Sequence, residues 1–295
     1  MTEGGEALTG CFGVMAGLGQ SKGVDDNGRE AMGGIWAAVK ENRAVGQDVH
    51  RLRLDAPGVA AAARPGQFVM LRVAHGNDPL LARPFSIHGV LEGDLLILYK
   101  VVGRGTRILS QIKPGQKTLF LWGPLGAGFD LNVQRPVLVA GGMGIAPMAF
   151  AAAQSQAGGK APLLLYGGPS RAYMLWDDLV ADADYLTNDI NWRATTEDGS
   201  MGKAGLVTEL LDETLAAPGF TCGGVLACGP MPMLKAVARI CQERGVACQV
   251  SLEAPMACGL GACLGCAVPA AAGGYLRACQ EGPVLDAGRV DWERV

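Results

Sequence analysis

Short runs in which apolar and polar residues alternate fill the chain from about residue 35 to residue 125. Alternation with a period of two is typical of strands that bury one face. Turn pairs such as Pro65-Gly66 and Glu92-Gly93 separate several of these runs. The pattern predicts six strands, at Ile35–Glu41, Val49–Asp55, Gln67–Val73, Phe85–Val90, Asp94–Val102 and Gln116–Trp122. With one small helix near Thr106–Ile112, they indicate a closed antiparallel barrel.

Beyond Arg135 the rhythm changes to apolar runs that alternate with helical patterns. The predicted strands are Pro136–Ala140, Leu163–Tyr166, Ile190–Thr195, Val225–Cys228 and Ala247–Leu252. The predicted helices are Pro147–Gln156, a helix capped by Ser170 that runs to about Val180, Val207–Ala216 and Met231–Arg244. Strands that alternate with helices imply a parallel sheet flanked by helices, of the nucleotide-binding type.

The fold class is therefore α/β plus β, with four segments. We expect a flexible extension at 1–34, a six-stranded barrel domain at 35–130, a parallel-sheet domain at 131–253 and a small cysteine-bearing segment at 254–295. The first segment is rich in glycine without a clear period, and we assign it no chemistry.

Composition excludes several classes of partner. A hydrophobic fraction of 49% and a charged fraction of 18% are typical of a globular protein, and the net charge of −3 gives no basic surface for nucleic acid. Glycines interrupt the uncharged stretch 136–159, so it predicts a buried strand, a turn and a helix rather than a membrane span. Nine cysteines without a secretory signal point to the reducing cytoplasm.

Four of the cysteines carry the strongest chemical signal. Cys258, Cys263, Cys266 and Cys279 follow the spacing C-x4-C-x2-C-x12-C, which matches the plant-type pattern for a [2Fe-2S] cluster. Structural zinc sites usually show two short knuckles separated by a spacer, whereas this chain has one tight triplet and one distant ligand. Zinc remains the main alternative.

Two motifs in the barrel are candidates for a flavin nucleotide. The first is Arg83-Pro84-Phe85-Ser86, whose arginine can pair with a phosphate and whose serine can reach a flavin edge. The second is Leu98-Tyr99-Lys100, which leads through a glycine turn to Gly105-Thr106 at a helix start suited to a pyrophosphate. A surface ion pair for Arg83 and a core position for Tyr99 are the alternatives.

Two further motifs follow strands of the parallel sheet. Gly141, Gly142 and Gly144 form a strand-to-helix turn, which is the context that a dinucleotide phosphate loop requires, although the turn is not the G-x-G-x-x-G fingerprint. Cys228 ends a strand before Gly229-Pro230, where a small thiol could contact a nicotinamide ring. A packing role for the glycines and an ordinary buried thiol are the alternatives.

Taken in order, these motifs resemble the ferredoxin–NADP reductase superfamily. More closely, they resemble the family of electron-transfer subunits of type B dihydroorotate dehydrogenase, from about Trp36 to the end. The most specific part runs from Met256 to Cys266 and continues at Cys279-Gln280-Glu281-Gly282-Pro283-Val284. The family usually has a third consecutive glycine where Met143 stands, which is a departure.

The resemblance implies an FAD-binding barrel, an NAD-binding sheet domain and a [2Fe-2S] segment. The implied FAD contacts are Arg83, Pro84, Phe85, Ser86, Leu98, Tyr99, Lys100, Gly105 and Thr106, and the implied cluster ligands are Cys258, Cys263, Cys266 and Cys279. The implied function, in pyrimidine biosynthesis, is to pass electrons from an FMN-containing dihydroorotate dehydrogenase catalytic subunit to NAD⁺, in a heterotetramer.

Two alternatives stay open. The chain could serve an NADH-dependent ferredoxin:NADP transhydrogenase, a sulfide dehydrogenase or a hydrogenase complex, which share the same three parts. It could also be a zinc-stabilised binding module without redox activity.

Overall fold

The computed structural model describes residues 33–73, 78–115, 119–176, 179 and 190–295. The predicted extension at 1–34 lies outside this range except for its last two residues. The start of the strand predicted at Gln116–Trp122 and the end of the helix predicted after Ser170 also lie outside it.

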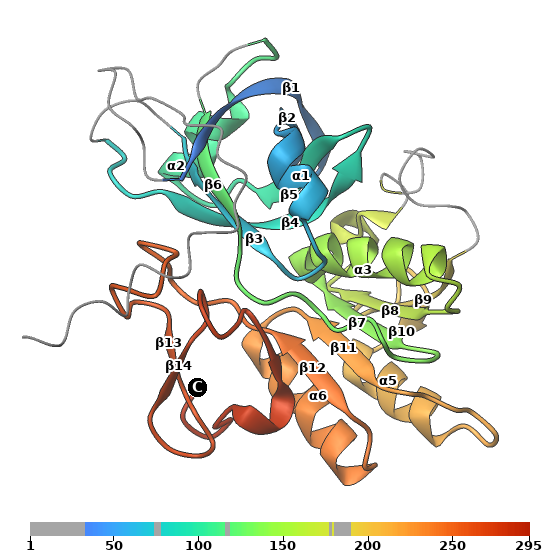
Figure 1. Cartoon of the computed structure of the whole chain (residues 1–295). Coiled ribbons are helices and arrows are strands. Elements are labelled where there is room, and N and C mark those ends of the chain that lie inside the picture. The colour runs from blue at the N-terminus through green and yellow to red at the C-terminus, as the bar shows by residue number, and fades with distance from the viewer. Residues whose placement is uncertain (1–32, 74–77, 116–118, 177–178, 180–189) are drawn as a thin grey trace, which may run out of the picture.

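The N-terminal half forms the predicted closed barrel, drawn at the top of Figure 1. Its strands follow the order β1-β2-β5-β4-β3-β6 and all pair antiparallel. They are β1 (Ile35–Gly46), β2 (Val49–Asp55), β3 (Phe68–Arg72), β4 (Arg83–Leu91), β5 (Asp94–Lys100) and β6 (Leu119–Leu125). Two short helices accompany them, α1 (Pro57–Ala62) and α2 (Arg104–Ser110). The pattern analysis missed α1, which is an alanine-rich turn with proline in its first position.

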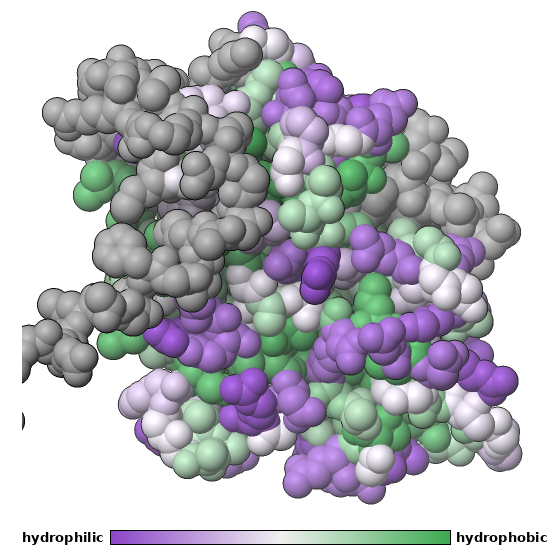
Figure 2. Space-filling model, in the orientation of Figure 1, coloured by the Kyte–Doolittle hydropathy of each residue, from purple (hydrophilic) through white to green (hydrophobic). Residues whose placement is uncertain are grey.

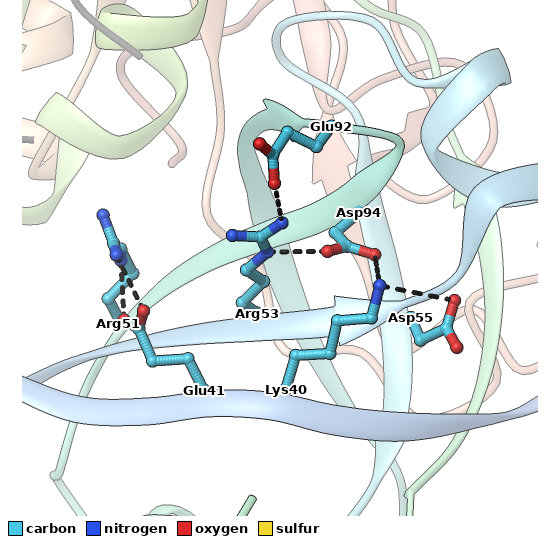
Figure 3. Close-up of polar contacts among 7 residues, drawn as sticks. All are labelled: Lys40, Glu41, Arg51, Arg53, Asp55, Glu92 and Asp94. Carbon is cyan, nitrogen blue, oxygen red and sulfur yellow. Dashed lines mark hydrogen bonds and ion pairs between the residues drawn. The ribbon is translucent and has the colours of Figure 1, made fainter. Parts of the chain in front are cut away.

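Ion pairs connect the strands on one side of the barrel (Figure 3). The Asp94 carboxylate is only 2% exposed and accepts hydrogen bonds of 2.6 Å from both Lys40 and Arg53. Burial acts to raise the pKa of Asp94, but these two cations outweigh it and lower the pKa. Beside them, Arg51 of β2 forms two parallel hydrogen bonds with the Glu41 carboxylate of β1. The cations and anions thus tie β1, β2 and the start of β5 together.

The second half forms a seven-stranded sheet with the order β10-β9-β8-β7-β11-β12-β15. Its strands are β7 (Val137–Gly141), β8 (Leu163–Gly168), β9 (Asn191–Thr196), β10 (Lys203–Ala204), β11 (Val225–Cys228), β12 (Cys248–Ser251) and β15 (Val284–Asp286). All neighbours pair parallel except β12 and β15, which pair antiparallel. The parallel sheet expected from the sequence is therefore confirmed, with one antiparallel strand at its edge.

The two faces of the sheet follow from the period of two. Leu138, Leu164 and Leu226 point to the face covered by α3 (Ile145–Ala157), which lies between sheet and barrel. The alternate residues, such as Val137 and Leu165, point to the face covered by α5 (Val207–Ala216) and α6 (Met231–Glu243). Strands buried on both faces are apolar at nearly every position, which explains the continuous apolar runs in the sequence.

The helix predicted to start at Ser170 begins later than expected, because helical backbone is first seen at Trp176. A 3-10 turn, η2 (Arg171–Tyr173), directly follows Ser170, whose side chain makes no capping hydrogen bond. Met174 is already extended, and Met174, Leu175 and Trp176 are all buried in the core between sheet and barrel. Helical backbone is present at Trp176 and Leu179, and the N–H of Leu179 donates to the carbonyl oxygen of Leu175 at 3.0 Å, so Ser170 does not cap this helix.

The C-terminal segment contains β13 (Ala267–Pro269), β14 (Tyr275–Arg277) and η3 (Ala287–Arg289), and it lies against both other parts (Figure 1). Cys266, Ala278 and Cys279 pack on Phe68 and Met70 of the barrel. Strand β15 then joins the sheet, so the segment is held at both sides.

No helix among the described residues is long and apolar enough to cross a bilayer. Hydrophilic and hydrophobic residues are interspersed over the face drawn in Figure 2.

Candidate functional site

A cavity of about 540 Å³, here called the barrel cavity, lies where the barrel, the sheet and the C-terminal segment meet. Eight of the nine residues expected to contact FAD line it: Arg83, Pro84, Phe85, Ser86, Leu98, Tyr99, Lys100 and Thr106. The two barrel motifs are far apart in sequence, but β4 and β5 are neighbours in the barrel. The pairing of these strands therefore brings both motifs to one site.

The ninth residue, Gly105, does not line the cavity but lies next to Arg83, which does. It lies in the first turn of α2, and a Cβ there would come within 2.4 Å of Arg83 Nε. Glycine thus leaves the room in which the Arg83 guanidinium lies against α2. The Thr106 hydroxyl accepts the backbone N–H groups of Val102 (3.0 Å) and Gly103 (3.1 Å), which closes the start of this helix.

Tyr99 belongs both to the barrel core and to the cavity wall. Its side chain is 2% exposed, and its hydroxyl donates to Asn42 Oδ1 at 2.8 Å. Burial raises the pKa of this phenol. Its ring stacks on His50, with 5.4 Å between centroids, and meets the edge of Phe85. Because the hydroxyl is already paired, Tyr99 can offer a bound nucleotide its ring rather than a hydrogen-bond donor.

A second cavity of about 710 Å³, here called the sheet cavity, opens beyond the carboxyl ends of the parallel strands. Its wall includes Gly141 and Gly142 at the end of β7, Gly167 and Gly168 at the end of β8, and Glu197 after β9. This edge of the sheet is where a dinucleotide is expected to bind.

Gly144, the third glycine of the turn, serves packing. The turn contains the 3-10 helix η1 (Gly142–Gly144), and a Cβ at Gly144 would lie 2.0 Å from the carbonyl oxygen of Cys228. The turn after β7 is thus pressed directly against the end of β11. Any side chain at position 144 would collide with the backbone of Cys228, so only glycine fits there without a shift of the backbone.

Two residues line both cavities. Met143, which stands where a third consecutive glycine was expected, and Lys100 of the barrel occur in both walls. The departure from the glycine pattern is therefore located at the boundary between the two cavities.

Cys228 lines the barrel cavity, together with a group that the sequence analysis missed. Burial and the nearby Glu253 charge raise the pKa of the Cys228 thiol to about 12, so it is a neutral group. Burial also raises the pKa of Glu253 itself. The missed residues form the stretch from Ser251 to Met256, between β12 and the first cluster cysteine. No local pattern in the sequence marks this stretch as part of a nucleotide site.

The four cysteines of the C-terminal motif come together as two pairs. Cys266 Sγ and Cys279 Sγ are 3.1 Å apart, and the side chains of Cys258 and Cys263 are within hydrogen-bonding reach of each other. The charge of Cys258 contributes to the raised pKa of Cys279, so the two pairs lie near each other. No three His, Cys, Asp or Glu side chains in the part of the chain described are grouped as for a single ion. Two pairs of thiols fit a centre with two irons and two ligands on each.

Backbone amides of the loop point at these sulfurs. The N–H of Leu260 donates to Cys258 Sγ at 3.3 Å, and that of Gly261 donates to Cys279 Sγ at 3.1 Å. Burial acts to raise the pKa of Cys258, but the amide hydrogen bonds outweigh it and lower the pKa to about 6. Such N–H groups stabilise thiolate ligands, as a cluster requires. Cys263 is exposed whereas Cys266 and Cys279 are buried, so one pair faces the surface and the other the barrel.

Comparisons with known proteins agree with these sites. Residues 253–291 match the model of the iron-sulfur cluster binding domain of dihydroorotate dehydrogenase B, and residues 138–239 match the oxidoreductase NAD-binding domain. The chain is 39% identical over 256 residues to the dihydroorotate dehydrogenase B (NAD(+)) electron transfer subunit of Desulforamulus reducens, covering 84% of this chain and 95% of that relative. It is 36% identical to that of Geobacillus thermodenitrificans, covering 89% and 98%.

Solved structures give a similar result. The chain resembles one from an NADH-dependent reduced ferredoxin-NADP oxidoreductase, with a TM-score of 0.73 and 27% identity over 89% of this chain and 92% of that one. It also resembles the ferredoxin reductase in carbazole 1,9a-dioxygenase, with a TM-score of 0.60 and 26% identity over 76% and 70%.

Proposed function

This chain belongs to the family of dihydroorotate dehydrogenase B electron-transfer subunits, and from that premise we propose that it carries electrons between a catalytic partner and NAD⁺. The partner is an FMN-containing dihydroorotate dehydrogenase subunit, and two chains of each kind form a heterotetramer. The complex works in the cytoplasm, in pyrimidine biosynthesis.

The observation that carries the proposal is the continuity of the three sites. Met143 and Lys100 separate the sheet cavity from the barrel cavity. Met256 lines the barrel cavity, and Cys258 follows two residues later. Sites for a nicotinamide, a flavin and a cluster thus lie in series along one molecule.

The residues present fit FAD in the barrel cavity. Arg83 offers a guanidinium for the pyrophosphate, Tyr99 offers a ring face, and Ser86 offers a hydroxyl. A bound flavin can exchange a hydride with a nicotinamide and single electrons with an iron-sulfur centre. The chain itself positions these groups, and the apolar residues Met143, Phe85 and Leu98 line the barrel cavity around them.

The sheet cavity suits NAD(H). Gly141 and Gly142 allow the backbone to approach a pyrophosphate, and Glu197 can accept hydrogen bonds from ribose hydroxyls. The boundaries at 35–130, 131–253 and 254–295 are proposed as the extents of the FAD, NAD and cluster parts.

A second candidate function is supported by the likeness to the NADH-dependent reduced ferredoxin-NADP oxidoreductase. A subunit of such a complex would use the same three sites with another partner. The identity of the partner therefore separates the two functions.

The experiment is anaerobic purification of the tagged full chain from its native host, with identification of the proteins that accompany it. We expect an FMN-containing dihydroorotate dehydrogenase subunit in equal amount, and dihydroorotate-dependent reduction of NAD⁺ by the complex. A ferredoxin:NADP oxidoreductase subunit in its place would refute the proposal. A colourless, zinc-containing protein would refute redox function altogether.

A cluster-specific variant completes the test. Cys266→Ser should abolish the cluster spectrum and the transfer of electrons from the partner, because it removes one ligand of the buried pair. FAD content and the reduction of FAD by NADH should persist. Equal loss of FAD would contradict the separation of the two sites.

A further inference from the structure

An ion pair stands beside the buried cysteine pair. Arg277 ends β14, two residues before Cys279, and its Nε lies 3.1 and 3.2 Å from the two carboxylate oxygens of Glu281. The Glu281 carboxylate also accepts the backbone N–H of Arg277 at 2.7 Å, and the Arg277 Nη2 donates to it as well. The carboxylate of Glu281 is thus bound by both the backbone and the side chain of Arg277, and these bonds fix the direction of the guanidinium.

The remaining arm of the guanidinium reaches the cysteine loop. Arg277 Nη1 donates to the carbonyl oxygen of Gly261 at 3.3 Å, and the N–H of Gly261 donates to Cys279 Sγ at 3.1 Å. Gly261 has φ +77, and a Cβ there would approach Gln280 Oε1 to 2.9 Å and Arg277 Nη1 to 3.3 Å. The guanidinium therefore holds the residue whose amide contacts a ligand sulfur.

We propose that Arg277 and Glu281 form a positioning pair that keeps the Gly261 amide on Cys279 Sγ and thereby raises the reduction potential of the cluster. The inference rests on the proposed function, in that the four cysteines hold a [2Fe-2S] centre. An N–H group that donates to a ligand sulfur stabilises the more negative, reduced state, and loss of this hydrogen bond lowers the potential.

The pair acts through position because its two charges cancel. The Arg277 and Glu281 side chains are 38% and 30% exposed, so their contribution to folding is small and their variants should fold. A charge mechanism and a positioning mechanism predict different signs. Removal of Glu281 leaves the positive charge of Arg277, which by charge alone would raise the potential. Removal of Glu281 also frees Arg277 from Gly261, which by positioning lowers it.

The experiment compares Arg277→Met and Glu281→Ala in the full chain, assembled anaerobically with its cofactors. The midpoint potential and g-values of the reduced cluster are measured by redox titration with electron paramagnetic resonance, and FAD content is measured in parallel. Arg294→Met is the matched control, because Arg294 lies in the same segment and pairs with Asp291 at 3.8 Å.

We expect both variants to shift the midpoint to more negative values and to change the g-values, while the control matches the wild type. Arg277→Lys, which keeps one donor for Gly261, should give a smaller shift, and it replaces Arg277→Met if that variant assembles no cluster. Unchanged potentials, or shifts of opposite sign in Arg277→Met and Glu281→Ala, would overturn the proposal. A wild-type chain that assembles no cluster would instead refute the proposed function.

Discussion

The contact between the turn after β7 and the end of β11 gives a sharp test of how the two cavities are held in place. A Cβ at Gly144 lies 2.0 Å from the carbonyl oxygen of Cys228, 2.4 Å from its carbonyl carbon and 2.9 Å from the Gly229 nitrogen. All three are backbone atoms, so no side chain can rotate away. Gly144 has φ −59, a conformation open to alanine, so Gly144→Ala tests the contact without backbone strain.

The size of the effect follows from these distances. Non-bonded contacts are comfortable at about 3.5 Å, so relief of the 2.0 Å contact requires the turn and β11 to separate by roughly 1.5 Å. Overpacking of this kind costs about 1–3 kcal/mol of stability. A displacement of about 1 Å between reacting groups can slow a reaction by about 10²-fold. We therefore expect hydride transfer from NADH to the bound flavin to slow by about 10²-fold.

The assay is anaerobic stopped-flow reduction of the flavin by NADH. The cluster spectrum serves as the check that the variant has folded. Gly158→Ala is the control, since Gly158 ends the same helix, has φ −80, and its Cβ would make only ordinary contacts of 3.4 and 3.5 Å. We expect wild-type rates for the control. A Gly144→Ala rate within twofold of the wild type would refute the idea that this contact positions the two sites.

Three further predictions concern single residues. Arg83→Ala should weaken FAD retention by at least about tenfold, because a charge-assisted hydrogen bond contributes about 1.5–3 kcal/mol. The flavin content after gel filtration measures this, with Arg104→Ala as the control. An unchanged flavin content would mean that Arg83 only makes its hydrogen bond with Leu81. Asp94→Asn should lower the free energy of unfolding by about 2 kcal/mol in denaturant titrations. Because folding lowers the pKa of Asp94, its contribution to stability is complete above about pH 4 and is lost as the pH falls below it. The difference in unfolding free energy between variant and wild type should therefore shrink in acid. A difference that stays constant with pH would contradict this. Glu197→Ser should raise kcat/KM for NADPH relative to that for NADH, since a carboxylate repels a 2′-phosphate. An unchanged preference between the two nucleotides would place Glu197 away from the ribose.

Local patterns in the sequence were sufficient for most of the longer elements and for the cysteine motif. Alternation with a period of two predicted the barrel strands, and long apolar runs predicted the strands of the sheet, because each reflects which faces a strand buries. Cys258, Cys263 and Cys266 lie within nine residues, so chain geometry alone keeps them close. The arginine and tyrosine motifs of the barrel could be found because strand ends and glycine turns are local features.

The tertiary structure decided which of these local features meet. Glu253 and Met256 have no local signal for a flavin site, and they line the barrel cavity only because β12 ends beside it. The helix expected to begin at Ser170 begins only at Trp176, after Met174 and Leu175 have entered the core. The bond from Arg277 to Gly261 joins residues 16 positions apart across a folded loop. Sequence patterns report what each short segment prefers, whereas these contacts depend on the packing of distant segments, which only the complete fold determines.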